Sequence, residues 1–108
     1  MIEIREYLDT NGDSPFRAWF DELDAAAAAK VTVAVARLEQ GNVSRLKSAG
    51  GGILEHRIEF GPGYRIYLGR DGDTLVILLG GGTKKHQQRD IEDARVRWAD
   101  FKRRKRKG

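Results

Sequence analysis

The side chains that could carry chemistry in this 108-residue chain are mainly cationic. Arg57 and Arg65 carry guanidinium groups, which can bind phosphate oxygens in pairs but are poor proton carriers, and an ion pair of Arg65 with Glu59 is the simpler interpretation of the residues alone. His86 follows the pair Lys84-Lys85 and is a candidate acid or base, because imidazole titrates near neutral pH. The chain has no cysteine and two histidines, which excludes a thiol nucleophile, a zinc finger and a histidine-rich metal site.

Charge is distributed unevenly along the chain. Residues 84–108 hold eleven basic and four acidic side chains, whereas residues 1–83 hold nine basic and twelve acidic ones. This asymmetry predicts a polyanionic partner for the C-terminal third, with nucleic acid as the first candidate. The basic tail, residues 102–108, contains six consecutive cations that could dock on RNA or could simply be a solvated helix end.

Length and composition predict a single domain over residues 1–108. Hydrophobic residues make up 40% of the chain, which is enough for one compact core. The longest apolar runs have five residues, and the first twelve residues lack the apolar segment of a signal peptide. We therefore expect a cytoplasmic protein with no membrane contact.

The first half of the chain predicts a strand followed by a helical hairpin. Ile2, Ile4 and Leu8 suggest a short strand. Ser14 before Pro15 is a typical helix N-cap, and Asp24 is a second one, opening an Ala-rich helix that ends at Gly41.

The second half predicts a three-stranded meander and a final helix. Residues 42–52 are expected to form a loop, and strands follow from Ile53, at 64–68 and at 75–79. A helix from about Lys85 has the apolar stripe Ile91, Ala94, Trp98 and Phe101. The prediction is an α+β domain with an antiparallel sheet made of the N-terminal strand and the meander.

The turns also predict which strand residues face each other. A three-residue loop at 61–63 would pair Glu59 with Arg65 and Arg57 with Tyr67. His56 then lies on the apolar face as a structural residue. The opposite, solvated face would carry Glu55, Arg57, Glu59, Arg65 and Tyr67.

Three ordered segments carry a family resemblance. They are Glu55-His56-Arg57-Ile58, then Gly61-Pro62-Gly63-Tyr64-Arg65-Ile66-Tyr67, and then residues 78–91, which read LLGGGTKKHQQRDI. Together they resemble the RelE/ParE toxin superfamily, most closely its HigB-like addiction module killer protein branch. Two positions depart from that branch: His56 replaces a leucine, and Thr83 replaces the aspartate that precedes the lysine.

The resemblance implies a RelE-like fold and metal-free cleavage of mRNA in the ribosomal A site, without a cofactor. In that reaction the ribose 2′-OH attacks its own 3′ phosphate, with a base, an acid and stabilising cations. Arg57 and Arg65 match the family arginines and would stabilise charge. Lys84 matches the family lysine, and it or His86 would transfer protons. Tyr67 would stack on a base or donate its hydroxyl. Further RNA contacts would come from Lys85, Arg89, Lys102, Arg103 and Arg104.

Two other patterns are weaker. Gly80-Gly81-Gly82 before a helix could cradle a phosphate, but it matches no nucleotide-binding fingerprint. Asp90, Glu92 and Asp93 could suggest a metal, but Asp90 and Asp93 more simply offset the helix dipole and neighbouring arginines.

The leading hypothesis is therefore the toxin of a type II toxin–antitoxin pair, a ribosome-dependent mRNA endonuclease. Its partners would be the ribosome, mRNA and a cognate helix-turn-helix antitoxin, which could bridge toxins into a hetero-oligomer. The alternatives are a ParE-like inhibitor of DNA gyrase, which needs no nuclease site, and a non-catalytic nucleic-acid-binding protein.

Overall fold

The computed structural model describes residues 1–107, and its first half follows the local sequence signals. β1 (Glu3–Glu6) is followed by α1 (Pro15–Asp21) and α2 (Ala25–Glu39). Ser14 Oγ accepts a hydrogen bond from the Arg17 N–H, and the Asp24 carboxylate accepts one from the Ala27 N–H. Both predicted N-caps and the helical hairpin are thus confirmed.

The sheet has five strands and is mixed. β2 (Lys47–Gly50), β3 (Ile53–Ile58), β4 (Tyr64–Asp71) and β5 (Leu75–Thr83) join β1 in the order β1-β5-β4-β3-β2. The expected antiparallel sheet is wrong in one pair, because β1 runs parallel to β5. The chain between β1 and β5 runs through the helical hairpin and then through β2, β3 and β4, which gives the long connection that parallel pairing requires. Residues 47–50, expected in a loop, form the fifth strand.

The β3–β4 hairpin has a longer turn than expected. Arg57 pairs with Arg65 and Ile58 with Tyr64, so residues 59–63 form the turn. The predicted pairs of Glu59 with Arg65 and of Arg57 with Tyr67 are therefore wrong. A shift of two residues keeps each side chain on its face, which is why the predicted faces survive the error.

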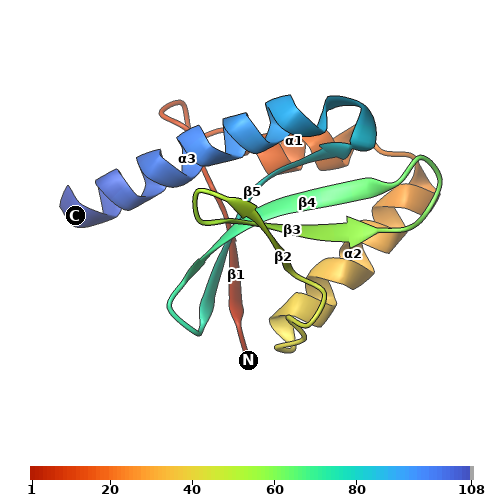
Figure 1. Ribbon diagram of the computed structural model, residues 1–108, viewed down its shortest axis with the longest axis horizontal. Helices are drawn as coiled ribbons and strands as arrows, with labels where there is room; N and C mark the ends of the chain where they lie inside the picture. The colour runs from red at the N-terminus through yellow and green to blue at the C-terminus, as the bar shows by residue number, and fades with distance from the viewer. Residues whose placement is uncertain (108) are drawn as a thin grey trace.

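Helices cover both faces of the sheet (Figure 1). α1 and α2 pack on the face that carries Ile58, Ile66 and Leu68, and His56 lies on this side as expected. α3 (Gln87–Lys107), entered through the short helix η1 (Lys84–His86), packs on the other face against Tyr67 and Ile77. The face predicted to be solvated is thus largely buried under α3.

Glycines allow α3 to approach the sheet closely. A Cβ atom added to Gly69 of β4 would lie 2.6 Å from the ring of Trp98, and one added to Gly52 would lie 3.0 Å from the Trp98 Nε1. Real Cβ atoms essentially never come as close as 2.6 Å, and 3.0 Å is an unusually tight contact, so these two glycines set how closely α3 packs on the sheet.

We therefore predict that Gly69→Ala lowers the free energy of unfolding by about 1–3 kcal/mol, through overpacking against Trp98. Trp98→Phe removes the half of the ring that meets the new methyl group. In a urea-denaturation double-mutant cycle, the combined variant should lose less stability than the sum of the two single changes. Strict additivity would contradict this packing contact.

Candidate functional site

Three adjacent strands place the predicted site residues side by side. Arg57 of β3 lies opposite Arg65 of β4, and Arg65 lies opposite Gly82 of β5. Paired residues of antiparallel strands project to the same face, so both guanidinium groups share the face that α3 covers. Glu55 precedes Arg57 by two positions and projects to this face as well.

Glu55 is the centre of this group. Its carboxylate is buried, with a residue exposure of 4%, and Oε1 accepts a hydrogen bond from Arg57 Nε at 2.8 Å. Oε2 accepts one from Gln87 Nε2 at 3.0 Å and lies 3.5 Å from Arg65 Nε. A buried carboxylate needs such compensation, because an isolated charge in the interior is strongly unfavourable. Glu55 thus links β3, β4 and the start of α3. We call Glu55, Arg57, Arg65 and Gln87 the Glu55 group.

The two arginines differ in access to solvent. The Arg57 side chain is 49% exposed, whereas that of Arg65 is 9% exposed. Arg57 is therefore placed to meet a ligand, and its hydrogen bond to Glu55 raises the pKa of its guanidinium. Arg65 lies in the interior, where it is part of the packing as well as of the charge.

Tyr67 is fully buried beneath α3. Burial and the negative charges of Glu55 and Asp90 raise the pKa of its phenol well above the ordinary value. Its hydroxyl is buried and finds no hydrogen-bond partner within residues 1–107. The interpretation of Tyr67 as a surface residue that stacks on a base is therefore wrong for this arrangement.

The basic segment Lys84–His86 borders the Glu55 group. These three residues form η1 and are exposed, and Gln87, which follows directly, donates to Glu55. The structure thus brings Lys84, Lys85 and His86 to the end of the sheet where Arg57 and Arg65 lie. Arg89 is exposed one turn further along α3.

The three glycines of β5 make room for side chains of this chain rather than for a phosphate. They lie within the strand, and a Cβ atom on Gly80, Gly81 or Gly82 would collide with Arg97, Trp19 or Asp90 respectively. Arg97 of α3 donates to the carbonyl of Leu79 at 3.0 Å. The interpretation of this run as a phosphate cradle is therefore wrong.

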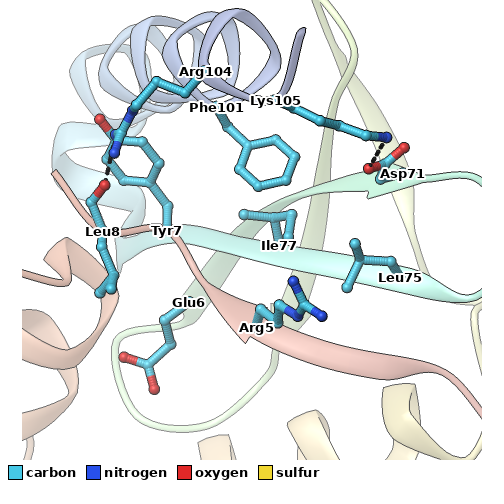
Figure 2. Close-up of a pocket in the computed structure, with 10 residues that line it drawn as sticks. All are labelled: Arg5, Glu6, Tyr7, Leu8, Asp71, Leu75, Ile77, Phe101, Arg104 and Lys105. Atoms are coloured by element: carbon cyan, nitrogen blue, oxygen red, sulfur yellow. Dashed lines mark hydrogen bonds and ion pairs between the residues drawn. The ribbon is translucent and has the colours of Figure 1, made fainter. Parts of the chain in front are cut away.

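Part of the basic tail is docked onto the domain. Arg104 donates to the carbonyl of Leu8 at 2.6 Å, pairs with Asp100 and lies over the ring of Tyr7. Figure 2 shows Arg104 directed at Leu8 and Lys105 directed at Asp71, with the Phe101 ring between them. These contacts border a pocket of about 450 Å³. Arg103 also pairs with Asp100, and Lys102 lies 5.6 Å from the Trp98 ring centroid. Arg104 and Lys105 therefore contact the folded domain and are not simply a solvated helix end.

Two members of the site, Glu55 and Gln87, were missed as site residues. Glu55 carried a usable signal, since it shares the alternating pattern of Arg57 and belongs to the first quoted segment. Gln87 gave no such signal, because only the packing of α3 on the sheet brings its amide to Glu55.

Across residues 1–107, no three histidine, aspartate or glutamate side chains are grouped so that they could hold a metal ion. No helix in that range has both the length and the apolar character required to cross a membrane.

Comparison with known proteins identifies relatives over most of the chain. The family model described as Phage derived protein Gp49-like (DUF891) matches residues 18–100. An uncharacterized protein of Haemophilus influenzae is 43% identical over 82 residues, which cover 75% of this chain and 83% of that protein. The range matched by the family model includes Glu55, Arg57, Arg65 and the segment 84–86, and it ends before the basic tail.

We predict that Glu55→Ala lowers the free energy of unfolding by about 3–5 kcal/mol, because it leaves Arg65 buried without its carboxylate. Gln87→Ala is the matched control, since it removes one amide hydrogen bond from the same carboxylate and should cost about 0.5–1.5 kcal/mol. Urea denaturation measures both. Equal losses for the two variants would show that Glu55 is not the centre of the group.

We also predict that Tyr67→Phe leaves the free energy of unfolding unchanged or raises it by up to about 1 kcal/mol, because the buried hydroxyl has no partner. In the unfolded chain Tyr67 has the pKa of an ordinary phenol, about 10. Since burial raises its pKa in the folded state, the unfolded state loses its proton first. Stability should therefore fall above about pH 10, and less steeply in Tyr67→Phe. An identical alkaline decline in both proteins would contradict the raised pKa.

Proposed function

The chain belongs to the phage-derived Gp49-like family, a RelE/HigB-type toxin family of toxin–antitoxin systems, and we propose that it cleaves mRNA on the ribosome. Membership of this family implies an antitoxin partner. Cleavage of mRNA is our proposal, and one observation supports it. Arg57 is half-exposed, is held in place by a buried carboxylate, and lies at the end of the sheet that presents Lys84, Lys85 and His86.

This arrangement suits cleavage of a ribose phosphate backbone. The 2′-OH attacks the adjacent phosphorus, the bond to the 5′-oxygen breaks, and the products are a 2′,3′-cyclic phosphate and a 5′-hydroxyl. Arg57 donates to the phosphate oxygens as negative charge develops on them. Arg65 has an indirect role: it pairs with Glu55, and Glu55 accepts the hydrogen bond that orients Arg57.

Proton transfer falls to the exposed segment η1. One group must take the proton of the 2′-OH, and another must supply a proton to the leaving 5′-oxygen. Lys84 and His86 are the two candidates, because both are exposed beside the Glu55 group. Lys85 and Arg89 would contact the backbone of the same RNA.

A second candidate function is inhibition of DNA gyrase by protein binding. The observation that favours it is the same carboxylate, because Glu55 offsets part of the positive charge of Arg57 and Arg65. A toxin that only blocks a protein does not need an uncompensated phosphate site. The two candidates differ in what stops first after induction, translation or DNA supercoiling.

We predict that Arg57→Ala abolishes growth arrest in induced cells while the protein stays folded, because the side chain is half-exposed. Arg5→Ala is a matched control: Arg5 is also exposed and also pairs with a glutamate two positions away, at 2.6 Å, but on β1. Circular dichroism checks the fold, and labelled-methionine incorporation measures translation. Full toxicity of Arg57→Ala would remove Arg57 from the mechanism.

Lys84→Ala and His86→Ala assign the proton transfer. Loss of a group that transfers a proton in the rate-limiting step should lower cleavage by roughly 10²–10⁴-fold. A loss below about tenfold for both variants would show that neither side chain is the acid or the base.

A further inference from the structure

The open edge of β3 carries a basic pocket that the Glu55 group does not use. β2 pairs with β3 over residues 53–55, so positions 56–58 lie beyond this pairing. There the end of α2 and the segment that follows it meet β3, around a pocket of about 400 Å³ lined by Arg37, Asn42, Arg45 and His56. Every side chain that lines it can donate a hydrogen bond, and none is acidic.

His56 is buried in the wall of this pocket without a partner. It is 7% exposed, and its Nδ1 makes no hydrogen bond within the described part of the chain. Burial lowers the pKa of the imidazole, and the charges of Arg45 and Arg37 lower it further. The other charged residues around His56 are Lys30 of α2, Arg57 of β3 and Glu59 of the β3–β4 turn. An oxyanion is the ligand chemistry that fits this lining, since it would offset these cations and accept hydrogen bonds.

The two arginines of this pocket, Arg37 and Arg45, differ from several other arginines of the chain in having no carboxylate partner. Arg57 and Arg65 share Glu55, Arg17 pairs with Glu6, and Arg104 pairs with Asp100. By contrast, neither Arg37 nor Arg45 has an ion pair or a side-chain hydrogen bond to any of residues 1–107. Their full charge is available to a ligand.

The pocket is continuous with Arg57. A second hollow of about 170 Å³ shares Arg37, Arg45 and His56 with the first and extends to Lys30 and Arg57. Glu59 is its one acidic lining residue. A row of cations thus follows the strand edge from the end of α2 to the exposed arginine of the Glu55 group.

We propose that the Arg37–Arg45–His56 pocket binds a backbone phosphate of an RNA strand whose neighbouring nucleotides reach Arg57. The guanidinium groups donate to the non-bridging oxygens, and the pocket thereby sets the direction in which the strand crosses the edge of β3. This inference rests on the proposed function for the choice of RNA. The phosphate chemistry rests on the pocket alone.

The test uses the full chain and an oligonucleotide that cannot be cleaved, a short 2′-deoxy-substituted RNA with a fluorescent label. Anisotropy measures its affinity for wild type, Arg37→Gln/Arg45→Gln and the matched charge control Arg5→Gln. In parallel, inorganic phosphate and acetate are titrated while the His56 ring signals are followed by NMR. The two arginines make no ion pairs within residues 1–107, so the double variant should remain folded.

We expect phosphate, at concentrations where acetate has no effect, to shift the His56 signals of wild type but not of the double variant. The double variant should bind the oligonucleotide at least about tenfold more weakly, with a salt slope shallower by about 0.7 for each lost phosphate contact. Unchanged affinity and slope relative to Arg5→Gln would overturn the proposal, as would equal shifts of the His56 signals by phosphate and acetate.

An mRNA-cleavage assay on ribosomes, run beside these binding measurements, separates this proposal from the nuclease proposal. If the pocket binds the oligonucleotide through Arg37 and Arg45 but no mRNA is cut, the pocket stands and the nuclease fails. If mRNA is cut while the double variant keeps full affinity, the nuclease stands and the pocket fails.

Discussion

The buried carboxylate of Glu55 is the interaction on which the candidate site depends. It accepts hydrogen bonds from Arg57 and Gln87 and lies beside Arg65, so one side chain links β3, β4 and the start of α3. A carboxylate in the interior is tolerated only with such partners, and removing the carboxylate would leave Arg65 buried without its counter-charge. The orientation of Arg57 and the position of η1 over the sheet therefore depend on the same group.

This arrangement has a chemical consequence. Because Glu55 offsets part of the charge of the two arginines, the sheet face alone offers a modest attraction for phosphate. The cations that remain without carboxylates lie around it, in η1 on one side and at the edge of β3 on the other. An RNA strand that uses both would be held by the periphery and oriented by Arg57 at the centre. The Glu55 group then contributes more to the orientation of the RNA than to the affinity for it.

Much of the fold could be predicted because its signals are local. The N-caps Ser14 and Asp24 and the alternation in β3 and β4 each depend on residues close in sequence. The parallel pairing of β1 could not be predicted, because its partner β5 is separated from it in the sequence by two helices and three strands. β2 gave no signal either, since the sequence Lys-Ser-Ala-Gly has no apolar alternation.

The site was predicted less completely, for a related reason. The types of Arg57, Lys84 and His86 indicated phosphate chemistry, but burial is a property of the assembled molecule. Only the docking of α3, fitted by Trp98 against Gly69, shows that Tyr67 and Arg65 lie inside and that Gln87 reaches Glu55. The register of the β3–β4 turn was also beyond a sequence argument, because turns of three and five residues place the same side chains on the same faces.

We propose that this chain cuts mRNA on the ribosome. Mapping the RNA ends produced in a reconstituted translation reaction tests this proposal. The purified protein is added to ribosomes stalled at a defined codon, and primer extension locates new 5′ ends on the mRNA. We expect a cut within the codon in the ribosomal A site, with a 5′-hydroxyl on the downstream fragment, and little cutting of the same mRNA without ribosomes. Intact mRNA on ribosomes, together with inhibition of DNA supercoiling by purified gyrase, would contradict it.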